Sequence, residues 1–233
     1  MKQILSKLRR ACDDYNMISP NDNITVGVSG GKDSMTLLTA MDLFRRFSPI
    51  PFDITGVCLD LGFNADYKPM IDYCRERGIR LEIIPTNIGK IVFESRKESN
   101  PCALCSKMKR GALNNAALEL GSRKVALGHH GDDLMETFFL ELFYNGAVKT
   151  FKPVTRLDKK GITVIRPLIY LRESEIIYAA NKEGIPKIES LCPADGATKR
   201  EDMKTLIKKL SREIPDSDES ILTALKKYIK EDN

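Results

Sequence analysis

The feature that most constrains the fold is a repeated alternation of short aliphatic runs with helical patterns, which continues to about residue 149. Runs at 23–28, 54–59, 80–84 and 125–128 predict strands, because they are β-branched or aliphatic and bounded by turn residues. After the first run, Leu37, Met41 and Phe44 recur at helical spacing, and Met70 and Cys74 do so after the second. This alternation predicts an α/β fold with a parallel sheet and helices on both faces, whose ligands bind at the carboxyl ends of the strands.

The remainder of the chain predicts a different organisation. The run at 162–167 ends in Pro167 and predicts an edge strand. Helical patterns at 173–183, 199–212 and 217–230 predict a helical C-terminal tail that covers the sheet. We therefore divide the chain into an N-terminal helical segment at 1–22, an α/β domain at 23–170 and a helical extension at 171–233.

A glycine turn lies between the first predicted strand and its helix, at Ser29-Gly30-Gly31-Lys32-Asp33-Ser34. Adjacent glycines let successive backbone N–H groups point into one concavity, and the following helix adds its positive end, so the segment can bind an anion. The two serines and Lys32 add donors. Asp33 would repel a phosphate unless a divalent cation lay between them, which points to Mg²⁺. The alternative is that Asp33 or Ser34 simply begins the helix as a cap.

The whole hexamer resembles the Ser-Gly-Gly-x-Asp-Ser loop of the N-type ATP pyrophosphatases, which cleave ATP between the α and β phosphates. It lacks the Gly-x4-Gly-Lys-Ser/Thr spacing of γ-phosphate-transferring enzymes. A second signature of the group, at residues 128–133, follows the fourth strand and opens a helix. The resemblance implies that Gly128 and His129 lie near the nucleotide and that Asp133, together with Asp132, faces the metal. Helix capping is the alternative for the aspartates.

Six cysteines are divided between two kinds of position. Cys102 and Cys105 form a C-x-x-C pair, expected on a loop, and Cys192 lies far along the chain. Such a pair can bind zinc, form a redox disulfide or hold an iron-sulfur cluster. Structural zinc normally takes four protein ligands, and both histidines belong to the nucleotide motif, so three cysteines fit a 4Fe-4S cluster with one open iron. The other cysteines, Cys12, Cys58 and Cys74, are predicted to be core thiols.

Over almost its full length the chain resembles the tRNA-cytidine(32) 2-sulfurtransferases, the tRNA 2-thiocytidine biosynthesis family. The resemblance rests on the segments at 7–10 and 15–18, the phosphate loop, 102–111, 126–133, Arg166-Pro167-Leu168 and Cys192. It implies an adenine nucleotide α-hydrolase-like fold of Rossmann type, with the pyrophosphatase domain at 23–170. It also implies a 4Fe-4S cluster on Cys102, Cys105 and Cys192. One departure concerns the loop of Cys192, which has one cysteine where family members often have two.

The resemblance further implies a reaction and its partners. ATP, with Mg²⁺, adenylates the base carbonyl of a tRNA cytidine; pyrophosphate leaves, and AMP departs when sulfur attacks. Asp33, Asp133, Lys109, Cys102 and Cys105 are then the expected catalytic residues. The sulfur donor would supply sulfide or a persulfide derived from a cysteine desulfurase, and a homodimer is expected.

The charge distribution agrees with an RNA substrate. Residues 101–130 contain five basic residues and one acid, so this window carries most of the chain's net charge of +5. Within it, Lys107 and Arg110 are the predicted contacts to RNA, with a solvated helix face as the alternative.

Two other functions share part of these motifs. A lysidine-synthetase-like ligase, or a sulfurtransferase acting on another nucleotide or a small acceptor, would share the nucleotide motifs, but the ligase would have no need of Cys102 and Cys105. A non-catalytic iron-sulfur or RNA-binding protein would have no need of Asp33 and Asp133.

The chain has no apolar run of the roughly 18–20 residues that span a bilayer, and its first residues lack the apolar core of a signal peptide. We therefore expect a cytoplasmic protein without a membrane partner.

Overall fold

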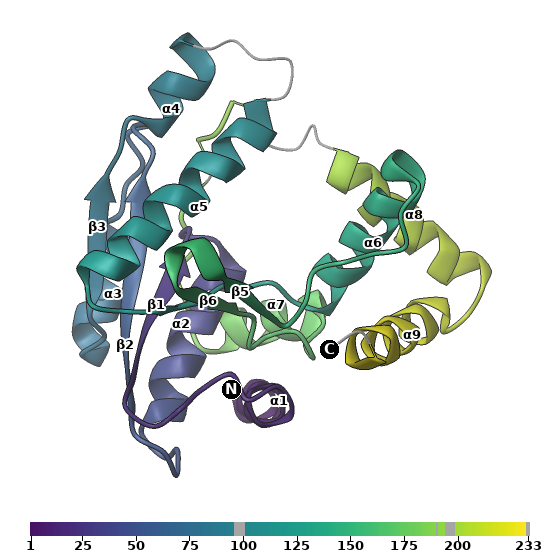
Figure 1. Cartoon of the computed structure of the whole chain (residues 1–233), viewed down its shortest axis with the longest axis horizontal. Helices are drawn as coiled ribbons and strands as arrows, with labels where there is room; N and C mark the ends of the chain where they lie inside the picture. Colours follow the sequence, from purple (N-terminus) through teal and green to yellow (C-terminus); the bar gives the residue numbers. More distant parts are fainter. Residues whose placement is uncertain (96–100, 190, 194–198, 232–233) are drawn as a thin grey trace.

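A computed structural model describes residues 1–95, 101–189, 191–193 and 199–231. The described residues form a mostly parallel six-stranded sheet in the order β3-β2-β1-β4-β6-β5 (Figure 1). The strands are β1 (Asp22–Val28), β2 (Phe52–Asp60), β3 (Leu81–Pro85), β4 (Lys124–Ala126), β5 (Val154–Leu157) and β6 (Ile162–Ile165). The predicted α/β class with a helical C-terminal region is confirmed.

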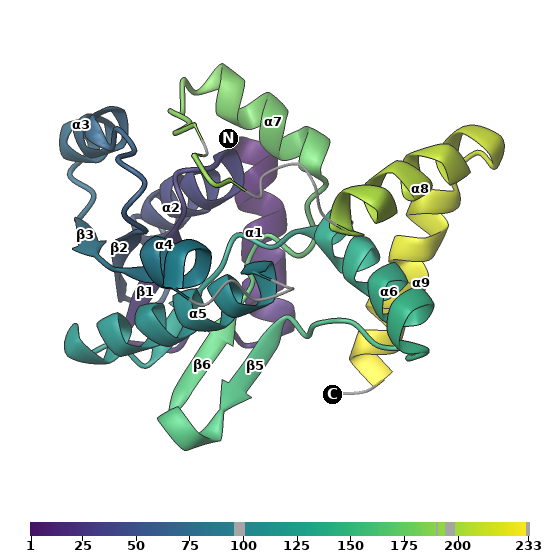
Figure 2. The same ribbon diagram turned by 90° about the horizontal axis from the view of Figure 1, so that it is seen from above.

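Helices lie on both faces of the sheet, as Figure 2 shows. The longer ones are α1 (Lys2–Asp14), α2 (Lys32–Arg45), α3 (Lys68–Arg77), α5 (Pro101–Glu119), α6 (Gly131–Asn145), α7 (Glu173–Lys182), α8 (Lys199–Glu213) and α9 (Ser217–Glu231). Short helical turns are α4 (Ile88–Lys90), the π-helical η1 (Ile91–Ser95) and the 3-10 turn η2 (Asp158–Lys160). Among the described residues, no helix is long and apolar enough to cross a bilayer.

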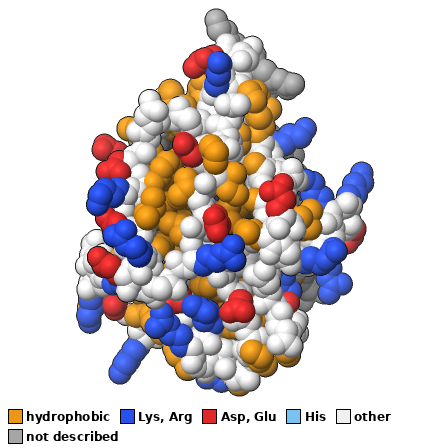
Figure 3. Space-filling model, turned by 90° about the vertical axis from the view of Figure 1, so that its left-hand side faces the viewer, with side chains coloured by type: hydrophobic (Ala, Val, Ile, Leu, Met, Phe, Trp, Pro, Cys, Tyr) orange, Lys and Arg blue, Asp and Glu red, His pale blue; other side chains and the backbone are white. Residues whose placement is uncertain are grey.

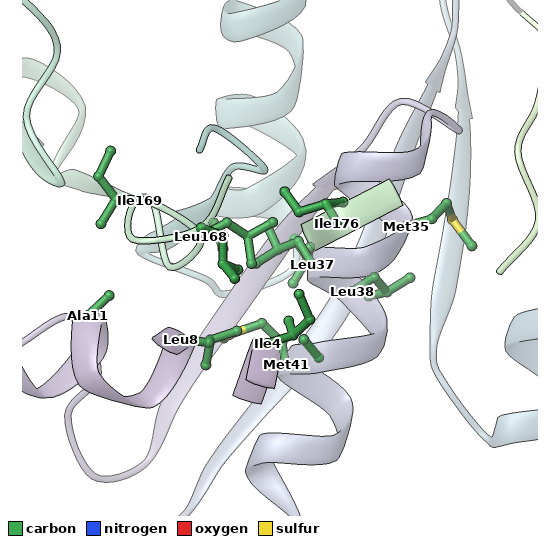
Figure 4. Packing of buried hydrophobic residues seen from close by; sticks show 14 of the residues in the cluster. Ile4, Leu8, Ala11, Met35, Leu37, Leu38, Met41, Leu168, Ile169 and Ile176 are labelled. Carbon is green, nitrogen blue, oxygen red and sulfur yellow. The ribbon is translucent and has the colours of Figure 1, made fainter. Parts of the chain in front are cut away.

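The main core lies on the face of the sheet that carries α1, α2 and α7. Ile4 and Leu8 of α1, Leu37 and Met41 of α2, and Ile176 of α7 are almost completely buried against one another (Figure 4). Burying an aliphatic side chain of this kind contributes about 1.5–3 kcal/mol each. Helix α5 covers the opposite face through a smaller cluster of apolar side chains, which comprises Ala117, Val125, Ile162 and Val164.

Three expectations from the sequence are wrong. Residues 162–167 do not form an edge strand: β6 lies between β4 and β5, and the antiparallel β5 is the edge. Helices α8 and α9 do not cover the sheet but pack against α6 and each other beside it. Cys102 and Cys105 do not lie on a loop but in the first two turns of α5, which begins at Pro101.

Among the described residues, β3 forms the other edge of the sheet and pairs only with β2. On this side of the molecule hydrophobic side chains gather at the centre of the face, with charged side chains around them (Figure 3). Ile71 of α3 is one of the exposed apolar residues, with 41% of its surface accessible.

Candidate functional site

The phosphate loop is built by the turn from β1 into α2. Gly30 has a φ of +81°, a left-handed conformation that favours glycine, and Gly31 is the N-cap of α2. The Ser34 hydroxyl donates to the Gly31 carbonyl at 3.0 Å and accepts from the Ser29 N–H at 3.1 Å. These bonds fix the loop around the positive end of α2, which is the arrangement of an anion-binding nest.

The second nucleotide motif contacts the first directly. A Cβ atom on Gly128 would lie 3.1 Å from the carbonyl carbon of Asp33 and 3.1 Å from the Ser34 nitrogen, so a larger residue would have to push this backbone away by a few tenths of an ångström. Strands β1 and β4 are neighbours with Val26 opposite Ala126, which brings their carboxyl ends together. The expectation that both motifs share one edge of the sheet is therefore confirmed by the topology.

Asp33, His129 and His130 each have a buried polar atom without a hydrogen-bond partner among the described residues: Oδ1 of Asp33 and Nδ1 of each histidine. Asp33 Oδ1 lies 3.8 Å from His130 Nε2, and Asp133 Oδ2 lies 3.4 Å from the same nitrogen. An unpartnered carboxylate oxygen close to a second carboxylate is a suitable set of donors for a hard cation such as Mg²⁺. These residues therefore fit the expected metal.

The two aspartates that follow His130 have different surroundings. Asp132 accepts hydrogen bonds on both oxygens, from Arg172 Nε at 3.1 Å and from the Glu173 N–H at 2.6 Å. Asp133 caps α6 through a bond from the His130 N–H at 3.0 Å, while its Oδ1 accepts from Arg200 at 2.9 Å. Capping is thus present for Asp133, and Asp132 connects α6 to α7.

Lys32 of the phosphate loop forms an ion pair with Glu173 at the start of α7. Its Nζ lies 2.9 Å from Glu173 Oε1 and 3.1 Å from Asp33 Oδ2. Burial opposes the charge on Lys32, but the bonds to Glu173 and Asp33 outweigh it and raise its pKa. Burial likewise opposes the charge on Glu173, yet the hydrogen bonds from Lys204 and Lys32 lower its pKa to about 2. Both groups are therefore ionised at neutral pH.

A small cluster of planar groups extends from the second motif. The ring of His129 lies 5.2 Å from that of Phe151, and the Arg166 guanidinium lies 5.0 Å from the same Phe151 ring. Burial lowers the pKa of His129 to about 4, and the cations Arg166 and Arg200 add to this, so its imidazole is neutral. Burial, with the positive charge of Arg110, also lowers the pKa of Arg166 to about 10.

The three cysteines of interest lie close enough to influence one another. Burial raises the pKa of Cys105, the charges of Cys192 and Cys102 raise it further, and Lys109 opposes the rise. Cys102 is exposed and Cys192 partly exposed. Within the part of the chain that the structure describes, no three His, Cys, Asp or Glu side chains are already arranged to hold a metal ion. The donors nevertheless fit a 4Fe-4S cluster in kind and number.

The backbone links this thiol group to the phosphate loop. The Ile188 N–H donates to the Gly30 carbonyl at 2.9 Å, and a Cβ on Gly30 would come 2.9 Å from that of Ile188. The segment that contains Ile188 therefore packs on the loop four residues before Cys192. The predicted core cysteines Cys12, Cys58 and Cys74 are all buried, as expected.

The predicted RNA contacts are at the surface of α5. Lys107, Lys109 and Arg110 are exposed, and Arg110 donates to the Ser106 carbonyl at 3.3 Å.

Sequence reasoning missed four further residues at the site, namely Arg172, Glu173, Arg200 and Lys204. Arg200 and Lys204 lie one turn apart on a predominantly charged helix, a pattern that predicts only a solvated face. The one available signal was at the start of α7, where Glu175 bonds back to the Arg172 N–H at 2.9 Å as in a capping box.

The chain is similar to known proteins over most of its length. The family model of the PP-loop domain matches residues 2–209. A tRNA-cytidine(32) 2-sulfurtransferase of Pelobacter propionicus is 41% identical over 220 residues, which are 93% of this chain and 82% of that protein. A protein of the same name from Geobacter metallireducens is 38% identical over 228 residues, covering 96% and 89% of the two chains.

Solved structures show the same fold. The U34-tRNA thiolase NcsA from Methanococcus maripaludis, solved with its 4Fe-4S cluster, matches with a TM-score of 0.80 and 21% identity, over 98% of this chain and 78% of that one. The NH3-dependent NAD synthetase of Campylobacter jejuni matches with a TM-score of 0.53 and 14% identity, over 99% and 93% of the chains.

Proposed function

Because this chain belongs to the PP-loop family and, within it, to the tRNA-cytidine(32) 2-sulfurtransferases, we propose that it thiolates a tRNA cytidine at the expense of ATP. The observation that carries the proposal is the contact of Gly128 with Asp33, which joins the two nucleotide motifs. Cys105, whose pKa responds to the charges of Cys192 and Cys102, packs in a cluster with Leu61, directly after β2, the neighbour of β1. A phosphate site and a thiol group at one edge match a reaction that activates an oxygen and then replaces it with sulfur.

In the first step the carbonyl oxygen of the base attacks the α-phosphorus of ATP, and the bond to the β-phosphate oxygen breaks. The leaving pyrophosphate carries the negative charge into the loop, where backbone N–H groups and Lys32 stabilise it. Asp33 and Asp133 would hold Mg²⁺, which supplies positive charge between the carboxylates and the phosphates. Gly128 allows the nucleotide motifs to close on each other without a side chain between them.

In the second step sulfide attacks the adenylated carbon and loses its proton, the carbon–oxygen bond breaks, and AMP leaves with the bonding electrons. If the sulfur comes as a persulfide, a second thiol must then break its S–S bond and form a disulfide. Cys102, Cys105 and Cys192 would hold a 4Fe-4S cluster, which supplies an open iron for sulfur. Lys109, one helical turn after Cys105, lowers the energy of negative charge on that thiol group. The cluster of His129, Phe151 and Arg166 offers planar groups against which a base could pack.

The RNA partner is expected to contact α5 through Lys107 and Arg110, which are exposed beside the cysteines. A tRNA substrate also places the reaction in the cytoplasm, where a desulfurase-derived persulfide or sulfide can supply sulfur. For the assembly we expect a homodimer, since the edge of β3 lies on a side of the molecule where apolar side chains gather at the surface (Figure 3). An Ile71→Glu variant, which adds a charge to the exposed surface of α3, that remains dimeric in light scattering would show that this part of α3 is not in the interface.

The proposal is tested by mass spectrometry of tRNA nucleosides from a strain that lacks the gene, complemented with plasmid-borne variants. We expect 2-thiocytidine to be absent without the gene, restored by the native chain and by Cys74→Ala, and not restored by Asp33→Asn or Cys102→Ala. Cys74 is a matched control because it is buried in the core away from the site. Persistence of 2-thiocytidine in the deletion strain would contradict the substrate assignment.

A second measurement separates the competing functions. The purified protein with MgATP and tRNA should release AMP and pyrophosphate, and it should lose about four irons together when Cys102 is replaced. A zinc-bound, colourless protein would favour a ligase of the lysidine type. Failure to hydrolyse ATP would favour a non-catalytic iron-sulfur or RNA-binding protein, and release of ADP would contradict the pyrophosphatase chemistry.

A further inference from the structure

Helix α8 brings two cations to the nucleotide site that the proposed reaction has not yet used. Arg200 donates from Nη1 to Asp133 Oδ1 at 2.9 Å and from Nη2 to Thr137 Oγ1 at 3.1 Å, and its Nε lies 3.8 Å from Glu136 Oε2. All three partners lie on successive turns of α6. The guanidinium is therefore fixed at three points above the carboxylate that the proposed function assigns to the metal.

Arg200 is more exposed to solvent than its partner Asp133. The side chain of Arg200 is 40% exposed, whereas that of Asp133 is 18% exposed. Asp133 Oδ2 is already engaged with the His130 N–H at 3.0 Å. A cation that binds Oδ1 of Asp133 must displace Arg200 from that oxygen, while Oδ2 keeps the bond that caps the helix. Arg200 therefore covers this carboxylate oxygen.

Lys204, one turn later on α8, attaches this helix to α7 through Glu173. Its Nζ lies 3.0 Å from Glu173 Oε1 and 2.8 Å from Oε2, and Glu173 also contacts Lys32 of the phosphate loop at 2.9 Å. When Lys32 turns toward a phosphate, Lys204 still neutralises Glu173. Helix α8 thus remains attached to the site while Arg200 changes partner.

This inference rests on the proposed function: we infer that Arg200 exchanges one anionic partner for another when ATP and the divalent cation bind. It pairs with Asp133 while no nucleotide is bound, and it moves to the phosphates of ATP when the divalent cation takes Asp133. The exchange conserves charge pairing: the cation replaces the guanidinium at the carboxylate, and the guanidinium gains an anion whose charge exceeds that of the aspartate. It also keeps Mg²⁺ from binding tightly before ATP arrives.

The test uses Mn²⁺ as the probe, followed by electron paramagnetic resonance, with α,β-methylene ATP as a non-cleavable nucleotide. For Arg200→Gln we expect Mn²⁺ to bind the nucleotide-free protein at least fivefold more tightly, because Asp133 is uncovered. We expect the analogue, in the presence of Mn²⁺, to bind at least fivefold more weakly, because one phosphate partner is lost. Lys208→Gln, an exposed position two turns further along α8, is the matched control and should change neither value.

A purely structural role for Arg200 would not produce changes of opposite sign. If Mn²⁺ binding is unchanged or weaker in Arg200→Gln, the inference is overturned, and unchanged affinity for the analogue overturns the transfer to phosphate. Should Arg200→Gln fail to fold, Thr137→Val removes one anchor of the guanidinium without changing charge and should tighten Mn²⁺ about twofold. Neither readout requires tRNA. If Arg200→Gln changes the affinities for Mn²⁺ and the ATP analogue as expected but the native protein does not thiolate tRNA, the proposed function is refuted and the inference stands.

Discussion

Gly128 lies against the peptide unit of Asp33 so closely that a Cβ there would be 3.1 Å from the Asp33 carbonyl carbon and 3.1 Å from the Ser34 nitrogen. The turn after β4 thereby fixes the position of the phosphate loop after β1. The two motifs, separated by nearly a hundred residues of sequence, act as one rigid surface, and substitutions at their contact should affect both stability and ATP use.

Gly128→Ala should separate the two motifs. The added methyl group forces the loop outward, so we expect a loss of about 1–3 kcal/mol in the free energy of unfolding and at least a tenfold fall in pyrophosphate release. Urea denaturation and a pyrophosphate assay measure the two effects. Gly111→Ala is the control: nothing lies within 4 Å of its Cβ position in α5, so stability should stay constant or rise by up to about 1 kcal/mol. Equal losses in the two variants would contradict the contact.

Alkylation of the cluster-free protein should distinguish the cysteines. Burial raises the pKa of Cys12 and Cys58 to about 12 and that of Cys74 to about 11, whereas Cys102 is exposed. At pH 8 the buried thiols are thiolate in only about one molecule in a thousand or fewer. We expect iodoacetamide to label Cys102 first and these three only after denaturation, as followed by peptide mass spectrometry. Labelling of Cys58 as fast as Cys102 would place it outside the core.

Glu136 should make stability depend on pH. Burial raises its pKa from 4.5 to about 7, and the neighbouring charge of Asp133 adds to this. Below pH 4.5 the carboxyl is protonated in both states; as pH rises through 7 the folded protein must carry a buried charge. The unfolding free energy should therefore fall by about 3 kcal/mol between these pH values on account of this group.

The variant Glu136→Gln should remove that fall, as measured by urea unfolding at pH 5 and pH 8. Glu141→Gln on the same helix is the control, because hydrogen bonds from Asn145 and Lys149 lower the pKa of Glu141 and give it the opposite sign. A pH dependence that is the same in Glu136→Gln as in the native chain would mean that another group carries it.

Arg172 should be a large contributor to the attachment of α9. Its guanidinium pairs with Asp132 of α6 and with Asp218 and Glu219 of α9. Arg172→Gln leaves two partly buried carboxylates without their cation, so we expect a loss of about 1–3 kcal/mol and a lower midpoint of thermal unfolding. Arg75→Gln, which breaks an exposed pair with Asp72, should cost less than about 0.5 kcal/mol. Similar midpoints for both variants would show that the Arg172 network contributes no more than a surface pair.

Local patterns predicted the parts of the fold that depend on local sequence. The phosphate loop, the strands β1 to β4 and the helices α7 to α9 were each foreseen from periodicity and turn residues. Strand β5 was not, because the four residues Val154–Leu157 have no clear alternation and are held by pairing with β6. That same pairing converts the expected edge at Ile162–Ile165 into an interior strand.

The ion pairs between residues far apart in the chain could not be predicted from the sequence. Arg200 and Lys204 differ in no local way from the other basic residues of α8; they matter because the packing of α8 on α6 sets them opposite Asp133 and Glu173. Likewise, both cysteines of the C-x-x-C pair were identified, but their helical setting was missed, although Pro101 at the helix start was an available signal.

The bond between Ile188 and Gly30 acts as a tether of fixed length. Four residues of chain separate Ile188 from Cys192, and even fully extended they reach no more than about 14 Å. In the proposed reaction, the phosphate loop and the Cys192 thiol would therefore lie within this reach of each other. We expect the RNA to stay in place between activation and sulfuration, without a protein arm that carries it.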